Sequence, residues 1–269
     1  MSASRLLRTF GLITSIALSP CHLFAQSSPA PPATADPFFE VAAIKPGNPD
    51  MRPGFPSNGR NFIAHNETVE GMLRFAYTIR SEQIINRPDW FSKDHFDISA
   101  TTNLTTEPTG DQWKAMLRKL LADRFGLTLH HEQRVLPVYV LSVGKSGAKL
   151  KASDPKDIGR NDASISITNI STTLSTRGET MSSLAIVLQG FLLDRPVVNQ
   201  TGLAGSYDLN INFTPIVSNV GGLRVPDQDP NSSAASIFTA IQDLGLRLDA
   251  TKQPVDVLVI EHASHPPLD

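Results

Sequence analysis

The stretch ETVEGMLRFAYTIRSEQIINRPDWFSKDHFDI, residues 67–98, has a counterpart in ETMSSLAIVLQGFLLDRPVVNQTGLAGSYDL, residues 179–209. Each begins with Glu-Thr and continues into a segment whose apolar side chains recur at helical spacing. Each then passes through a β-branched pair that ends in Asn, first Ile84-Ile85-Asn86 and later Val197-Val198-Asn199. Each closes on an aromatic-Asp-aliphatic triplet typical of a strand. This recurrence predicts that one folding motif is used twice.

The similarity continues beyond these stretches. Thr109 and Gln112 form a capping box that opens a second helix, and Gly126 ends that helix. In the later stretch an apolar helix ends at Gly245, so that Phe125-Gly126-Leu127 parallels Leu244-Gly245-Leu246. After each glycine we expect a hairpin-like pair of strands. The expected strands are Leu127–Arg134 and Leu136–Val143, then Leu246–Thr251 and Val255–Glu261.

The predicted fold class is therefore α+β, with two related copies that each run helix–strand–strand–helix–strand–strand. Phe38–Ile44 adds an N-terminal strand. We place the first copy at residues 38–147 and the second, with a short tail, at residues 148–269. One copy of roughly 110 residues has few elements, whereas two can share a sheet or a core. In fold alone, this order is similar to the N-terminal domains of secretins and outer-membrane signal transducers, which are interaction modules.

Residues 1–25 have the features of a secretory signal peptide. Arg5 and Arg8 give a basic start, and Phe10–Leu18 is an apolar run too short to span a bilayer. We expect cleavage after Ala25. Cys21 follows a lipoprotein-like sequence, but Pro20 stands where that motif needs a small residue, so lipidation is the less favoured outcome. Residues 26–37 are rich in Pro, Ala and Ser and are expected to form a disordered spacer.

The composition limits the classes of function. The 269 residues carry a net charge of −2, which argues against nucleic acid as a partner. A single Cys excludes a disulfide scaffold and a cysteine-based metal site. No later segment is long and apolar enough to span a membrane, so the mature chain is expected to have no transmembrane span.

The sequence assigns no catalytic, cofactor-binding or metal-binding residue, and no cofactor is expected. The adjacent His130 and His131 would point to opposite faces of a strand, which favours one half-buried and one solvated imidazole over a metal site. Asp97 and Asp208 occupy equivalent places in the two copies, which favours a structural role over a catalytic pair. His262 and His265 fall in a tail that is expected to fray. Trp90 is the candidate for a surface contact.

Several segments together match a known protein family. They are Phe39–Pro46, Pro88–Trp90, Phe96–Ile98, Met116–Phe125, Leu136–Tyr139, Asp194–Asn199, Thr201–Asp208 and Leu244–Leu246. Over nearly all of its expected mature length the chain thus resembles the soil-associated family of uncharacterised exported bacterial proteins, domain of unknown function 3738. The resemblance implies secretion, and it carries no catalytic residue with it. Some relatives look fused to membrane sensor-type metallopeptidases, but the zinc motif of those enzymes is absent from this sequence.

We therefore expect an exported, non-enzymatic binding or protein-interaction module of the bacterial envelope, periplasmic or extracellular. Exposed sheet edges, or the groove between the copies, would accept a peptide strand or an envelope protein. Two alternatives stay open. A secreted hydrolase would draw on Asp97, Asp208 and His130, and a sensor ectodomain would bind a small ligand between the copies.

Overall fold

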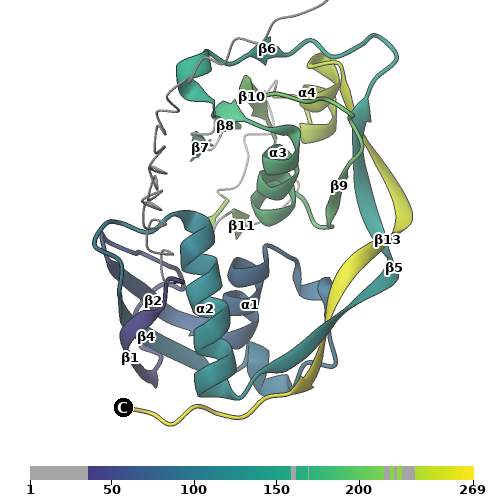
Figure 1. Cartoon of the computed structure of the whole chain (residues 1–269). Coiled ribbons are helices and arrows are strands. Elements are labelled where there is room, and N and C mark those ends of the chain that lie inside the picture. The colour runs from purple at the N-terminus through teal and green to yellow at the C-terminus, as the bar shows by residue number, and fades with distance from the viewer. Residues whose placement is uncertain (1–35, 159–161, 169, 215–218, 221–222, 226–233) are drawn as a thin grey trace, which may run out of the picture. The chain divides into compact units, whose positions relative to one another are not determined.

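Strand β4 (His95–Thr102) organises the first sheet. Phe96, Ile98 and Ala100 are buried on one face, and they alternate with side chains of greater exposure. β4 pairs antiparallel with β1 (Phe39–Pro46) on one side and with β2 (Asn61–Thr68) on the other. Helices α1 (Val69–Tyr77) and α2 (Gly110–Phe125) cover its buried face (Figure 1). We call residues 38–147, which hold these elements, the first half.

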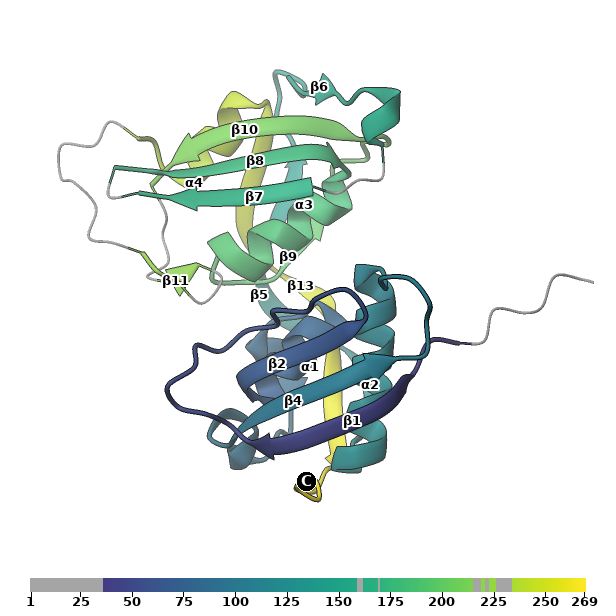
Figure 2. The ribbon, with the colours of Figure 1, turned by 90° about the vertical axis from the view of Figure 1, so that its left-hand side faces the viewer.

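The second half, residues 148–269, contains a sheet built around β10 (Tyr207–Phe213). β10 pairs with β6 (Lys151–Ala152) and with β8 (Thr172–Glu179), and β7 (Asp162–Ile167) lies on the outer side of β8 (Figure 2). The helices of the second half pack their side chains against this sheet and form a second hydrophobic core with it. These helices are α3 (Met181–Val187), which continues as the π-helical turn η4 (Leu188–Leu192), and α4 (Ile237–Asp243).

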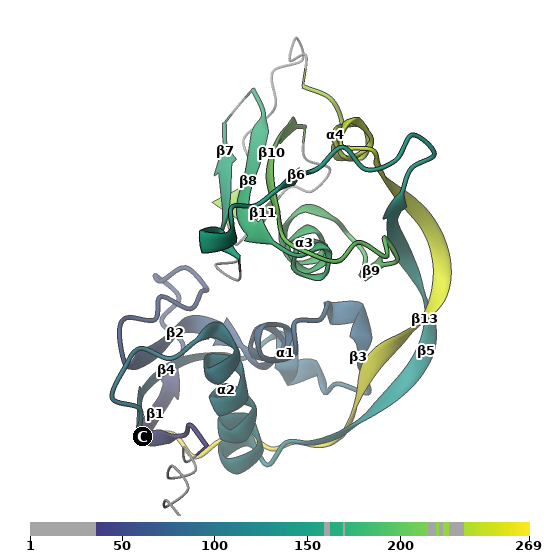
Figure 3. The ribbon, with the colours of Figure 1, turned by 45° about the horizontal axis from the view of Figure 1, so that its top comes forward.

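A third sheet joins the two halves. Its long strands β5 (Thr128–Val143) and β13 (Leu246–His262) pair antiparallel along almost their whole length and run side by side (Figure 3). β3 (Ile84–Ile85), from the first half, pairs parallel with β13. β9 (Val197–Asn199), from the second half, pairs parallel with β5. The prediction of two short strands after the second helix of each copy was wrong, because each of these pairs is one continuous strand, β5 or β13, that serves both halves.

The described chain confirms the mixed α+β class. The description covers residues 36–158, 162–168, 170–214, 219–220, 223–225 and 234–269, so the predicted signal peptide and nearly all of the spacer lie outside it. Residues 37–269 form one unit of contacts, and the predicted boundary between residues 147 and 148 stays a prediction. The remaining described elements are the short turns η1 (Ser81–Gln83), η2 (Asp89–Ser92) and η3 (Pro155–Asp157) and the paired strands β11 (Asn219–Val220) and β12 (Leu223–Arg224).

The same order of elements occurs in both halves. β2-α1-β3-β4-α2-β5 in the first half corresponds to β8-α3-β9-β10-α4-β13 in the second. The sheet order β1-β4-β2 likewise matches β6-β10-β8. An origin by duplication, and the likeness to secretin domains, stay predictions.

Local sequence chemistry explains where α2 begins and ends. Thr109 Oγ1 accepts a hydrogen bond from the Gln112 N–H at 3.3 Å, and Gln112 Oε1 accepts one from the Thr109 N–H at 2.8 Å. At the other end Gly126 has a left-handed φ of 57° and donates its N–H to the Leu121 carbonyl. Both ends of the helix are therefore where the capping residues predicted them.

The C-terminal segment is held against the first half. Its backbone bonds to Phe125 through the Ser264 N–H at 2.8 Å. Asp269 accepts a hydrogen bond from the Ile44 N–H at 3.0 Å and forms an ion pair with Arg124 at 2.8 Å. The expectation that this tail would fray was wrong. The contacts of Asp269 with Ile44 also occupy part of the backbone edge of β1. A peptide strand added to this sheet would have to pair at that edge.

Candidate functional site

The junction between β2 and α1 positions a buried carboxyl group. Asn66, at a bulge in β2, has a left-handed φ of 46°, and its N–H donates to Asp97 Oδ1 at 2.7 Å. Thr68 then caps α1 by accepting a hydrogen bond from the Gly71 N–H at 3.0 Å. Between these two residues lies Glu67, which is 9 % exposed.

Burial determines the acidity of Glu67. Desolvation raises the pKa of its carboxyl group from 4.5 to about 7, against smaller opposing effects from the Thr68 backbone N–H, Arg74 and His95. The carboxyl group lies so close to α1 that a Cβ on Gly71 would overlap Glu67 Oε2. Glycine at position 71 is therefore what lets the helix and this carboxyl group share the space.

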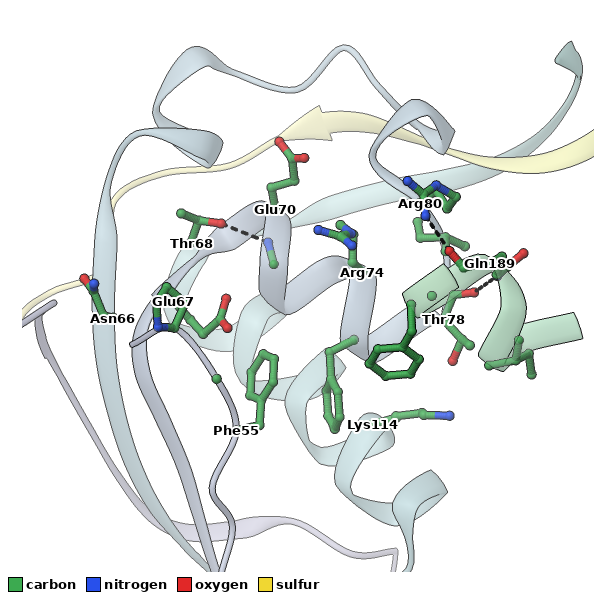
Figure 4. A pocket seen from close by; sticks show the side chains of 18 of the residues that line it. Phe55, Asn66, Glu67, Thr68, Glu70, Arg74, Thr78, Arg80, Lys114 and Gln189 are labelled. Atoms are coloured by element: carbon green, nitrogen blue, oxygen red, sulfur yellow. Dashed lines mark hydrogen bonds between the residues drawn. The ribbon is translucent and has the colours of Figure 1, made fainter. Parts of the chain in front are cut away.

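Glu67 borders a cavity of about 830 Å³ (Figure 4). The volume lies within the range of pockets that hold small organic molecules. The first half contributes most of the wall, and α3 with η4 contribute the rest. The lining residues are Pro53, Gly54, Phe55, Asn66, Glu67, Thr68, Glu70, Gly71, Arg74, Phe75, Thr78, Ile79, Arg80, His95, Lys114, Ile186, Gln189, Gly190, Phe191 and Leu193.

The two halves line the cavity with corresponding residues. Arg74 and Ile186 both stand seven positions after the Glu of the repeated Glu-Thr pair, and Ile79 and Phe191 both stand twelve positions after it. α1 thus presents a cation where α3 presents an aliphatic side chain. All charged lining residues belong to the first half, whereas the second half contributes uncharged residues, among them Ile186 and Phe191, which are each 43 % exposed.

Polar contacts between the halves close one rim of the cavity. Arg80 Nη1 donates to the carbonyls of Leu193, at 2.8 Å, and of Gln189. Gln189 Nε2 donates in return to the Thr78 carbonyl at 2.9 Å (Figure 4). Because these bonds join the end of α1 to η4, they fix the separation of the charged and apolar walls at this rim.

Most charged side chains of the lining have ionic partners. Glu70 pairs with Arg87 at 3.4 Å, Lys114 with Asp111 at 3.5 Å and Arg80 with Glu82 at 3.5 Å. Arg74 differs from these because its side chain has no ion pair and no hydrogen bond among the described residues. Its Nε, like that of Arg80, is buried without a hydrogen-bond partner. Arg74 and Glu67 both line the cavity (Figure 4), and the positive charge of Arg74 acts to lower the pKa of the Glu67 carboxyl group.

The candidates singled out from the sequence lie elsewhere, each with partners of its own. Asp97 bonds to Asn66, and Asp208 Oδ1 accepts from Ser153 Oγ at 2.6 Å and from the Gly178 N–H at 3.1 Å. These bonds lower the pKa of the Asp208 carboxyl group. Asp97 on β4 thus bonds to the backbone of β2, and Asp208 on β10 bonds to the backbone of β8, each beside a bulge in the strand pair. This arrangement is in keeping with a structural role.

The histidines were predicted less well. His130 pairs with Glu261 at 2.8 Å and His131 with Asp256 at 2.6 Å, all on the two long strands. Both imidazoles are exposed, so the expectation that one would be half-buried was wrong. Among the described residues no group of three or more His, Cys, Asp or Glu side chains could hold a metal ion.

Trp90, the candidate surface residue, is half-buried in η2. Its ring stacks on His265 with centroids 4.2 Å apart and meets Phe91 edge-on at 4.7 Å. His265 in turn pairs with Asp94 at 2.7 Å. His265, in the chain's own C-terminal segment, thus covers part of the Trp90 ring. A role of Trp90 in binding a partner stays a prediction.

Glu67 and Arg74 were not found from the sequence. In the sequence the repeated Glu-Thr pair marks the two copies, and the acid directly before each helix cap is the signal that points to this site. The second acid of the pair, Glu179, is also buried, at 2 % exposed. Arg74 gave no signal because a charged residue on a short helix, four positions after Glu70, is the ordinary pattern of a solvated helix face.

The fold and the cavity define an α+β protein with a pocket of ligand size. The chain belongs to a protein family of unknown function, DUF3738, whose model matches residues 70–263. No curated protein and no solved structure matched the chain. Among the described residues, no helix is long and apolar enough to cross a membrane.

Proposed function

We propose that this protein is an exported binding module that holds a small amphipathic molecule in the cavity beside α1, without chemical turnover. The cavity itself is the observation that supports the proposal. Its walls combine stacked Phe55 and Phe75, with ring centroids 4.4 Å apart, and the exposed faces of Ile186 and Phe191 with a few charged groups. Half of the lining residues are polar or charged, so the cavity offers both apolar surface and polar groups, which is the combination that an amphipathic molecule requires.

A secreted hydrolase is the second candidate. A carboxyl group with a pKa of about 7 inside a cavity suits general acid–base catalysis, and Glu67 has these properties. The residues first considered for hydrolysis, Asp97, Asp208 and His130, instead make separate sets of contacts. Binding without turnover accounts for the cavity with fewer assumptions. Ester or amide hydrolysis that is lost in Glu67→Gln would favour the enzyme.

The binding proposal predicts that the neutral fluorophore N-phenylnaphthylamine binds saturably with one molecule per chain. Phe191→Ser removes a partly exposed ring from the apolar wall, so we expect the dissociation constant to rise about tenfold. Fluorescence titration measures both. Phe38→Ser is the matched control, because Phe38 is 42 % exposed and lies outside the cavity lining. Equal loss in both variants, or binding without saturation, would contradict the proposal.

Export is part of the proposal and has its own test. Expressed from residue 1 in a Gram-negative host, the chain should appear in the periplasm as a product that begins at Gln26. Intact-mass measurement of the periplasmic fraction identifies this product. Ile16→Arg disrupts the apolar run and should block export, whereas Cys21→Ser should leave it intact. A membrane-bound, lipid-modified product that disappears in Cys21→Ser would show that the alternative processing is the correct one.

A further inference from the structure

We propose that the ligand of this cavity is a carboxylate with an apolar body, and that Arg74 binds its anionic head beside the carboxyl group of Glu67. This inference rests on the proposed binding function and names the chemical class of the ligand. It depends on which charges of the lining are already paired, on the position of Glu67 and on the apolar wall opposite.

The first observation is the imbalance of charge in the wall. Arg80 is engaged by two backbone carbonyls and by Glu82, and Lys114 is engaged by Asp111. The guanidinium of Arg74 has no ion pair or hydrogen bond among the described residues and interacts with Glu67 only at a distance. Because Arg74 lines the cavity, an anionic ligand bound there could supply the acceptor that its guanidinium lacks.

The second observation is the state of Glu67. With a pKa of about 7, its carboxyl group is half protonated at neutral pH and then leaves the charge of Arg74 uncompensated. A protonated carboxyl group can also donate a hydrogen bond to a carboxylate. The site therefore offers an anion one cation and, below neutral pH, one additional donor. A cationic ligand would instead meet Arg74 at close range.

The third observation is the wall that faces these groups. Phe55 and Phe75 stack beside the charged wall, and Ile186 and Phe191 form the apolar wall of η4 and α3. Together they provide a surface for an aromatic or alkyl body. The anionic head and the apolar body would thus bind to different parts of the same cavity.

Coupling to the proton on Glu67 follows from this arrangement. If the protonated form alone binds the anion, affinity falls about tenfold between pH 6 and pH 8. The other charged or titratable groups that line the cavity with Glu67 are Arg74 and Glu70 on α1, Lys114 on α2, His95 on β4 and Arg80. Asp97, also on β4, bonds to the neighbouring Asn66 N–H. Because a histidine can change charge in the same range, the variant His95→Gln is titrated alongside Glu67→Gln.

The test uses three probes with the same phenylbutyl body, namely phenylbutyrate, phenylbutanol and phenylbutylamine. Each competes with N-phenylnaphthylamine for the full protein at pH 6 and pH 8. We expect phenylbutyrate to displace the fluorophore at about a tenfold lower concentration than phenylbutanol at pH 6, with phenylbutylamine the weakest. Arg74→Gln should abolish this preference. Arg134→Gln, an exposed arginine on β5 that pairs with Glu132, should keep it.

The outcomes separate the two proposals. Preference for the carboxylate, lost in Arg74→Gln and independent of pH in Glu67→Gln, supports the inference. Binding of the fluorophore with equal or better competition by the alcohol or the amine overturns the inference and leaves the binding function standing. Failure of the fluorophore to bind overturns both. A pH dependence that disappears in His95→Gln and persists in Glu67→Gln would contradict the role given to Glu67.

Discussion

Replacement of Gly245 by alanine is expected to destabilise the fold by more than about 4 kcal/mol, which would leave little folded protein. Gly245 has a left-handed φ of 72°, and a Cβ there would overlap the carbonyl oxygen of Gly147. The carbonyl carbon of Gly147 and Ala148 Cα would lie only 3.0 and 3.1 Å away. All these atoms are backbone, so no side chain can rotate to make room.

The loop that meets Gly245 also cannot move away easily. The Gly144 N–H donates to the Gly245 carbonyl at 2.8 Å, and the Lys149 N–H donates to the Leu244 carbonyl at the same distance. A shift of the loop would break these hydrogen bonds. Relief of the overlap would therefore have to displace the first residues of β13.

Gly126 provides the matched control because it follows α2 as Gly245 follows α4. Its φ of 57° is also left-handed, but a Cβ there would meet only side chains, namely Ser264 Oγ at 3.2 Å and the His262 ring at an ordinary contact distance of 3.8 Å. Gly126→Ala should therefore cost about 1 kcal/mol. Urea unfolding measures both variants. Asn tolerates left-handed φ, so Gly126→Asn should recover stability while Gly245→Asn should not. Similar losses at the two positions would show that the overlap has no effect.

Glu67→Gln is expected to stabilise the protein by about 3 kcal/mol at pH 8 and to have almost no effect near pH 4.5. The pKa of Glu67 is raised in the folded state from 4.5 to about 7, so folding favours the protonated form. Its contribution to stability is fully present below pH 4.5 and is lost as the pH rises through 7. The difference between the two values corresponds to about 3 kcal/mol. Glutamine removes this penalty because it stays neutral.

Free energies of unfolding from urea titrations, taken at several pH values between 4.5 and 8.5, check this prediction. Glu107→Gln is the control, since Glu107 is exposed and the substitution changes charge in the same way. Its stability curve should run parallel to that of the wild type. If Glu67→Gln also runs parallel to the wild type across this range, Glu67 is solvated and its assigned role in the cavity is wrong.

The parts of the fold that depend on local chemistry were predictable. The capping pair of α2, its terminal glycine and the β-branched pairs of β3 and β9 all lie where the sequence placed them. Strands β2 and β8 were missed because their buried positions alternate with polar residues, and β8 buries Thr172 and Thr176 beside Leu174. Threonine on a strand gives no hydropathy signal, although its propensity is favourable.

The long strands were split in the prediction because each contains a proline. Pro137 pairs with Lys252, and Pro254 pairs with Val135, within an unbroken ladder. β9 pairs with β5 only at Tyr139–Leu141, and β3 pairs with β13 only at Leu258 and Val259. Each proline thus lies where its strand has only one paired neighbour in the described sheet, so its missing N–H breaks no second ladder.

The cavity could not be read from the sequence for a different reason. Its walls come from residues between 53 and 114 and from residues between 186 and 193, and the separation of these walls depends on contacts such as that between Arg80 and Leu193. The burial of Glu67 depends on a bulge at Asn66, which in turn depends on Asp97 from another strand. Neither arrangement leaves a pattern in a single segment. The periodicity of apolar residues predicts which face of a single helix or strand is buried. It does not predict a site that forms where elements from the two halves meet.

The path of β13 affects the order in which the polypeptide can acquire structure. Leu258 and Ile260 complete the hydrophobic core of the first half, although every other buried member of that core precedes residue 128. During synthesis, the hydrophobic core of the first half therefore cannot be completed until β13 has left the ribosome. A translocation channel that threads extended polypeptide, as the proposed export would require, would receive a chain whose folding is delayed by its own topology.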